Sequence, residues 1–260
     1  YDITRVESVE APDGFVLVQG AELHPDNPFG GQRHHFVCLN IHENMDSTKM
    51  PPQHVIDKVN GQGGSVWLAH PHWSSINIMR DVLPLHGLAG IEVFNTICRT
   101  YGRGESSVHW DDWMDLANRL YPALANDDSH ALEADRRDTY HGWTWVRVKE
   151  RTANAVVDAL VRGSSYCSTG PEIRNIEVRR IDQQSDGRTL TEATVTCSPV
   201  QRIATISDAH GTEYHEHGAL FETATFALRA NARWVRFEVV DASGQKAWSN
   251  PFDLTGLERA

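Results

Sequence analysis

The chain has 260 residues, of which 40% are hydrophobic, so it can bury a sizeable core and is long enough for one large domain or two unequal ones. Its net charge of -11 argues against broad contact with nucleic-acid backbone or an anionic membrane surface, because both would repel it. No run of about eighteen apolar residues occurs, so we predict no membrane-spanning helix and expect a cytoplasmic location. Because Tyr1 is not an initiator methionine, we expect the numbering to begin inside a longer protein.

Short apolar runs alternate with amphipathic stretches from residue 15 to about residue 163, as in strands and helices wound into an α/β layer or barrel. Helices are predicted where apolar residues recur at three- and four-residue spacing, at 52–60, 106–120 and 153–162. The predicted strands cover residues 15–18, 36–41, 66–69, 91–94 and 123–125.

The pattern changes after Pro171, where the remaining apolar runs alternate or are β-branched and are separated by turns. This region is typical of a small β-sandwich, and we place the junction within 166–171. The sequence therefore predicts a first domain at 1–170 and a second at 171–260. The predicted strands of the second domain cover 173–181, 194–197, 203–207, 224–228 and 234–240.

Acidic and imidazole side chains gather where the predicted strands end. Glu22 follows the first strand, His70 ends the third, Asn95 ends the fourth, and Asp128 with His130 follows the fifth. In an α/β barrel the C-terminal ends of the strands converge on one rim, so these residues are expected to meet. Imidazole nitrogen and carboxylate oxygen are ligands that zinc, manganese and iron accept.

Several of these positions also have simpler explanations. His34 and His35 are adjacent before a strand and would face opposite sides, so we expect at most one to be a ligand and favour His35. His70 could instead fill a strand end, and the acidic run before His130 could cap a helix. The remaining histidines of this region are expected on the surface or in helix packing: His24, His42, His54, His86 and His109.

Templates for nucleophilic catalysis fit poorly. The chain has no GxSxG elbow, no GxxxxGK[ST] loop, no HExxH and no GxGxxG after a strand. The four cysteines are far apart and form no CxxC pair, so we expect mostly buried thiols.

Five short motifs, in this order, resemble the later motifs of the polymerase and histidinol phosphatase (PHP) superfamily of metallohydrolases. Residues 166–173 and 247–251 resemble its CehA/McbA-like subgroup, which extends the resemblance over nearly the whole chain. The resemblance implies a distorted (β/α)7 barrel, followed here by the β-sandwich. The five motifs are Gly20-Ala21-Glu22, His34-His35, Ala69-His70-Pro71, Ile91-Glu92-Val93 and Asp128-Ser129-His130.

The resemblance also implies two or three manganese, iron or zinc ions and hydrolysis of phosphate esters or, in some relatives, carbamates. Glu92 matches a further motif position, and we count it among the candidate metal ligands. The family opens with an HxH strand and an Asp-His pair that have no match before Glu22, so we expect that an N-terminal segment with the opening strands is missing from the chain. In the carried-over roles, Glu22 would bridge two metals, His35 and His70 would bind one of them, Asp128 would complete a second, and His130 a third.

The expected reaction is attack of metal-activated water on a small phosphate ester or carbamate. We assign His72 as a candidate proton donor and Arg99 or Arg136 as a candidate clamp on substrate oxygens. The second domain could cover the barrel or pair subunits into a homo-oligomer. The alternative is a non-catalytic module that binds carbohydrate or protein, for which exposed tryptophans such as Trp143 would be the contact.

Overall fold

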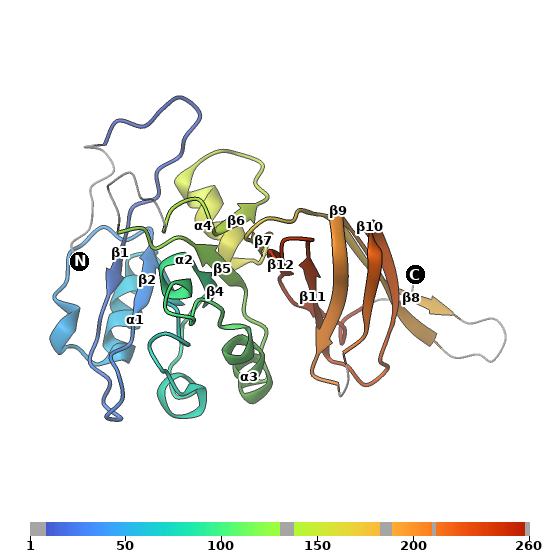
Figure 1. Cartoon of the computed structure of the whole chain (residues 1–260). Helices are drawn as coiled ribbons and strands as arrows, with labels where there is room; N and C mark the ends of the chain where they lie inside the picture. The colour runs from blue at the N-terminus through green and yellow to red at the C-terminus, as the bar shows by residue number, and fades with distance from the viewer. Residues whose placement is uncertain (1–8, 131–137, 183–188, 210–211, 258–260) are drawn as a thin grey trace. The chain divides into compact units, whose positions relative to one another are not determined.

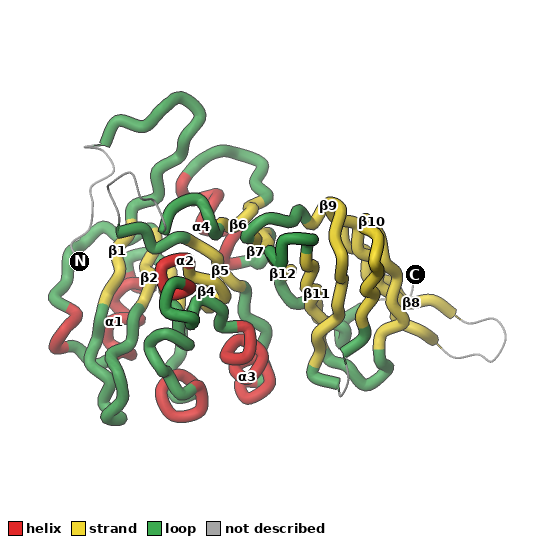
Figure 2. Tube along the Cα trace, in the orientation of Figure 1, coloured by secondary structure: helices red, strands yellow, loops and turns green. Residues whose placement is uncertain are grey.

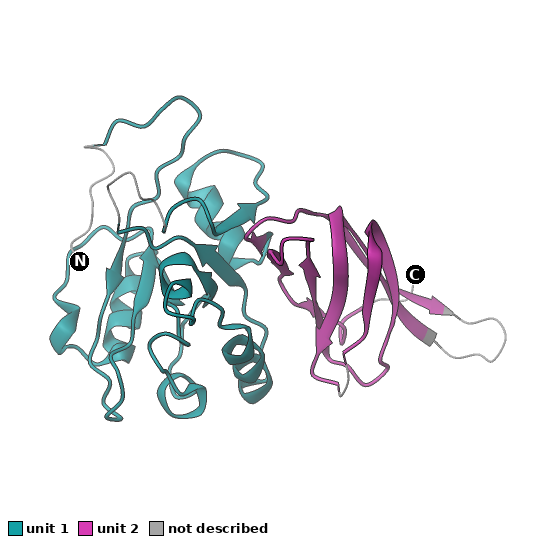
Figure 3. Ribbon diagram, in the orientation of Figure 1, with its two compact units in different colours: residues 1–165 teal, residues 166–260 magenta. Residues whose placement is uncertain are grey.

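The computed structural model describes residues 9–130, 138–182, 189–209 and 212–257. The chain divides into two compact units, 1–165 and 166–260 (Figure 3). In the described part of the second unit the chain forms strands and loops but no helix (Figure 2). Within the described ranges, no helix has the length and apolar character needed to cross a lipid bilayer.

A mixed five-stranded sheet organises the first unit, in the order β1-β2-β3-β4-β5 (Figure 1). β2 runs antiparallel to both of its neighbours, whereas β3, β4 and β5 run parallel to one another. A further short strand, β6 (Trp143–Val146), follows in sequence. The strands of the sheet are β1 (Gly20–Leu23), β2 (Phe36–Leu39), β3 (Ser65–Leu68), β4 (Gly90–Asn95) and β5 (Ala123–Asn126).

Amphipathic helices cover this sheet because each has one apolar stripe to bury. α1 (Pro52–Gly61) buries Val55, Ile56 and Val59, and α3 (Ser107–Ala117) buries Trp110, Trp113 and Met114. α4 (Ala153–Val161) contributes Leu160 to a cluster with Trp67 and Leu124. The remaining helical segments are short: α2 (Thr96–Arg99), a 3-10 turn (Ser47–Lys49) and a π-helical turn (Ile78–Val82).

The predicted (β/α)7 barrel is wrong for the described residues. Such a barrel needs each strand to run parallel to the next and to be followed by a helix, whereas β1 and β2 are antiparallel and joined without an α-helix. The predicted strand at 15–18 is also wrong, because the first described strand is β1 and Phe15 is 69% exposed.

Strand β9 (Thr189–Ser207) pairs with three other strands and so joins the parts of the sheet in the second unit. Its first half pairs with β8, its second half pairs with β11, and β10 pairs along both halves. The predicted β-sandwich is therefore corrected to one continuous hydrogen-bonded sheet around a core that includes Val195, Phe226 and Phe237. The other strands are β7 (Ser165–Ser168), β8 (Ile173–Asp182), β10 (Tyr214–Leu228), β11 (Trp234–Val240), β12 (Lys246–Ser249) and β13 (Phe252–Asp253).

A close approach at Gly90 gives a test of the packing in the first unit. A Cβ atom at this position would lie 2.2 Å from the carbonyl oxygen of Pro122 and 2.4 Å from Cζ3 of Trp67. We expect Gly90→Ala to lower the free energy of unfolding by about 1–3 kcal/mol in urea denaturation, because the backbone and the indole must both move. Gly61→Ala is the control, since a Cβ at Gly61 has no neighbour within 4 Å. Equal stability of the two variants would contradict this packing.

Candidate metal centre

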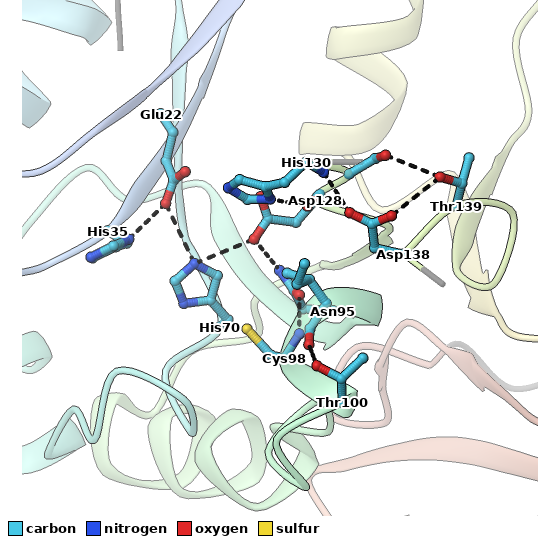
Figure 4. Close-up of polar contacts among 12 residues, drawn as sticks. Glu22, His35, His70, Asn95, Cys98, Thr100, Asp128, His130, Asp138 and Thr139 are labelled. Atoms are coloured by element: carbon cyan, nitrogen blue, oxygen red, sulfur yellow. Dashed lines mark hydrogen bonds and ion pairs between the residues drawn. The ribbon is translucent and has the colours of Figure 1, made fainter. Parts of the chain in front are cut away.

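Three imidazole rings converge on one carboxylate oxygen, Oε1 of Glu22. Figure 4 shows two of them, those of His35 and His70. Nδ1 of His35 lies 2.7 Å from it, Nε2 of His24 3.2 Å and Nε2 of His70 3.4 Å. The Glu22 side chain is only 19% exposed. A carboxylate and three imidazoles in so small a volume form a set of nitrogen and oxygen donors suited to a divalent cation.

The pairing of β1 with β2 explains why Glu22, His24 and His35 lie together. Residues two apart on a strand share a face, so Glu22 and His24 point to the same side of β1. The register pairs Leu23 with Phe36, which makes His24 and His35 the next opposing residues. Their ring centroids lie 4.1 Å apart. The sequence interpretation missed His24 because it placed the first strand at 15–18, and the alternation Glu22-x-His24 was the signal that could have found it.

The rest of the site comes from the C-terminal ends of β3 and β5. His70 follows β3 and Asp128 follows β5, and Nε2 of His70 lies 4.0 Å from Oδ2 of Asp128. Both residues have positive φ angles, 22° for His70 and 50° for Asp128, a conformation that side-chain-bearing residues rarely adopt. Strained backbone at two convergent polar residues is common at functional sites.

Asn95 and Glu92 of β4 fix the positions of His70 and Asp128 through hydrogen bonds. Oε2 of Glu92 accepts hydrogen bonds from the backbone N–H of His70 at 2.7 Å and from Nδ2 of Asn95 at 3.1 Å. Nδ2 of Asn95 also donates to Oδ2 of Asp128 at 3.1 Å, and its Oδ1 accepts from the backbone N–H of Cys98 at 2.9 Å. Glu92 thus fixes the position of His70 instead of joining the imidazole cluster.

A cavity of about 370 Å³ opens beside the cluster. Trp73 lies on one side of it, with its ring centroid 5.1 Å from that of His70 and 5.7 Å from that of His35. His130 is half-exposed, and its Nδ1 donates to the backbone oxygen of Asp128 at 2.7 Å. The lining residues are Glu22, His24, His35, His70, Trp73, Ile97, Cys98, Tyr101, Asp128 and His130.

Charge pairing governs the protonation of Glu22 and His70. Burial alone would raise the pKa of Glu22, but hydrogen bonds from His24, His35 and His70 outweigh it and hold that pKa well below its usual range. Burial would lower the pKa of His70, but the hydrogen bond to Glu22 and the nearby carboxylates raise it overall. Glu22 is therefore ionised, and the charged form of His70 is more favoured than in an ordinary histidine.

The other two carboxylates, those of Glu92 and Asp128, have too little positive charge nearby to offset the effect of burial on their pKa values. Burial raises the pKa of Glu92 from 4.5 to about 7, and it also raises the pKa of Asp128, to which the charge of Glu22 adds. A cation placed among these groups would stabilise their ionised forms. The electrostatics of the cavity therefore fit a bound divalent metal.

Several predicted residues lie elsewhere. His34 is buried and directs Nε2 to the backbone oxygen of Asp81 at 2.9 Å. His72 directs Nδ1 to the backbone oxygen of Glu105 at 2.9 Å, and Arg99 lies 5.9 Å from the centroid of the Phe94 ring. None of the three lines the cavity.

Arg136 lies outside the described residues. Asp127, next to the candidate ligand Asp128, points away from the cluster. Its Oδ1 accepts hydrogen bonds from Thr96, His141 and Gly142 and so fixes the loop that follows β5.

The donor atoms form two groups that could each hold an ion. Within each group the ligand atoms lie within 4.8 Å of one another, which a small closing movement would bring to coordination distance. The groups are Glu22, His24 and His35, and His70, Cys98 and Asp128.

Comparison with known proteins shows a distant structural likeness. No protein-family model matches the chain, and no curated protein matches it. Among solved structures, the chain is similar to a two-domain protein from Bacteroides vulgatus that contains a predicted PHP-like metal-dependent phosphoesterase, with 14% sequence identity and a TM-score of 0.47. The alignment covers 93% of this chain and 75% of that one.

The raised pKa of Glu92 predicts a pH-dependent stability of the metal-free protein. Because the folded pKa is about 7 and the ordinary value is 4.5, the folded state favours the protonated acid, and stability is lost as the pH rises through this window. Urea denaturation in the presence of a chelator should show wild type losing stability relative to Glu92→Gln from about pH 4.5 to about pH 7. Glu43→Gln, which changes an exposed glutamate, is the control. If the difference in the free energy of unfolding between wild type and Glu92→Gln does not change with pH, the burial of an ionisable acid at this position is contradicted.

Proposed function

We propose that this chain is a metal-dependent hydrolase whose centre is built around Glu22. The observation that carries the proposal is the convergence of His24, His35 and His70 on one oxygen of that carboxylate inside a cavity. Exposed acidic clusters are common on protein surfaces, but a largely buried carboxylate surrounded by imidazoles is typical of functional sites.

The donor types match borderline divalent cations such as manganese, iron or zinc. Such a cation supplies two effects, a lower pKa for a coordinated water and neutralisation of negative charge that develops on the substrate. Glu22 lies between the two candidate ligand groups, since His35 belongs to one and His70 to the other. It is therefore the residue best placed to hold two ions together.

His130 is the candidate for proton handling at the mouth of the cavity. Its Nδ1 lies 2.7 Å from a backbone carbonyl oxygen of Asp128, which can only accept, so Nδ1 carries the proton. In the neutral ring Nε2 then keeps its lone pair. This nitrogen can bind a third cation, as the sequence resemblance implies, or exchange a proton with a leaving group. Half-exposure of the ring leaves it accessible to substrate.

Phosphate esters are the first substrate class that we propose, following the PHP resemblance, with metal charge compensating that of the phosphate. Carbamates are the second. A specific observation favours them: no lysine or arginine appears among the described residues that line the cavity. A neutral substrate does not need a cationic side chain as a partner. In either case the substrate is a small molecule that fits about 370 Å³.

Removal of Glu22 or His70 should abolish metal binding and strongly reduce the rate of hydrolysis. We expect Glu22→Ala and His70→Ala to lose stoichiometric metal by elemental analysis. Loss of about 3 kcal/mol of metal-dependent transition-state stabilisation would reduce the rate roughly a hundredfold. The rate is measured with an aryl phosphate monoester, an aryl phosphate diester and an aryl carbamate, and we expect the phosphate esters to be cleaved faster.

His54→Ala is the matched control, because His54 is an exposed histidine on α1 outside the cavity. This variant should keep both the metal and the rate. Unchanged metal content and unchanged hydrolysis in Glu22→Ala and His70→Ala would refute the proposed function. A metal-free wild-type protein that cleaves none of these substrates would favour the binding-module alternative.

A further inference from the structure

Cys98 brings a sulfur atom to the candidate metal centre. It belongs to α2, which begins directly after β4, and it lines the cavity together with His70 and Asp128. Its Sγ lies within 4.8 Å of a ligand atom of each of these residues. Figure 4 shows Cys98 beside His70, on the same side of Asn95.

The position of this sulfur is fixed by the same side chain that fixes Asp128. Asn95 caps α2 by accepting the backbone N–H of Cys98 at 2.9 Å and donates to Oδ2 of Asp128 at 3.1 Å. A single amide therefore sets the spacing between a thiol and a carboxylate. Outer hydrogen bonds of this kind commonly orient metal ligands.

Ordinary packing explains two of the other three thiols, those of Cys38 and Cys197, better than it explains Cys98. Sγ of Cys38 lies 3.6 Å from the backbone oxygen of Phe36, and Sγ of Cys197 lies 3.6 Å from that of Glu222. Cys98 is only 2% exposed, yet its thiol donates no hydrogen bond to the described residues, although ligand atoms of His70 and Asp128 lie within 4.8 Å of it. A buried thiol that donates no hydrogen bond within the described chain, facing an imidazole and a carboxylate, is arranged as a ligand.

We propose that Cys98 is the sulfur ligand of a subsite completed by His70 and Asp128, and that this subsite selects thiophilic divalent cations such as zinc or cobalt over manganese. The group formed by Glu22, His24 and His35 has only nitrogen and oxygen donors. The two subsites thus differ in chemical softness, and soft thiolate favours the thiophilic metals. This inference rests on the proposed metal centre.

Absorption spectroscopy of the cobalt(II) protein tests the inference without measuring activity. The metal-free 260-residue chain is titrated with cobalt(II), and a sulfur-to-cobalt charge-transfer band is expected in the near ultraviolet. Cys98→Ser should lose this band, whereas Cys38→Ser, which changes a buried cysteine of the same unit, should keep it. Zinc affinity of Cys98→Ser should fall by more than the roughly 10- to 100-fold typical for loss of an outer-shell partner. Manganese affinity should change much less.

The outcomes separate this inference from the proposed function. Cobalt bound without a charge-transfer band would overturn the role of Cys98 and leave the metal-dependent hydrolase standing. Absence of cobalt binding would overturn both. If Cys98→Ser fails to fold, the wild-type spectrum still decides, together with alkylation mapped by mass spectrometry: zinc should protect Cys98, and equal labelling of Cys98 with and without zinc would refute the ligand role.

Discussion

The contact of three imidazole rings with the carboxylate of Glu22 is the interaction on which the candidate metal centre of the first unit depends. One oxygen receives imidazoles from the residue after β1, from the residue before β2 and from the second residue after β3. Each imidazole comes from a different stretch of chain, so the cluster exists only when β2 is paired with both of its antiparallel neighbours, β1 and β3. The low pKa of Glu22 follows from the same contacts, because they outweigh its burial.

A second layer of polar groups converts this cluster into a rigid one. Glu92 is fully enclosed and accepts from His70 and Asn95, while Asn95 reaches Asp128 and the start of α2. Held in this way, His70 and Asp128 can keep positive φ angles that an isolated chain would avoid. The site is therefore largely preorganised, and a bound cation would need only small movements of its ligands.

The sequence predicted the elements with strong local signals. The helices at 52–60, 106–120 and 153–162 and the strands at 66–69, 91–94 and 123–125 are confirmed to within a few residues, because apolar periodicity is a local property. The first strand was misplaced because the run at 15–18 is more apolar than β1. Whether neighbouring strands run parallel or antiparallel has no such local signal, so the barrel prediction failed.

The candidate site was predictable in part for the same reason. His70 and Asp128 end strands that the sequence locates, and the structure brings them to one cavity. His24 and Cys98 were missed: the first depends on the true position of β1, and the second lies in a four-residue helix too short for a periodic signal. Local sequence patterns do not show which residues from distant segments of the chain come into contact, so neither His24 nor Cys98 could be assigned to the site.

The register between β1 and β2 places a constraint on how this protein can change during evolution. Leu23 opposite Phe36 keeps Glu22 and His24 on the face that His35 reaches. A slip of one residue would turn both side chains of β1 to the other face. Substitutions and length changes in the segment 25–33 are thus tolerable only when they preserve this alignment, whereas a single insertion within β1 would separate the carboxylate from its imidazoles.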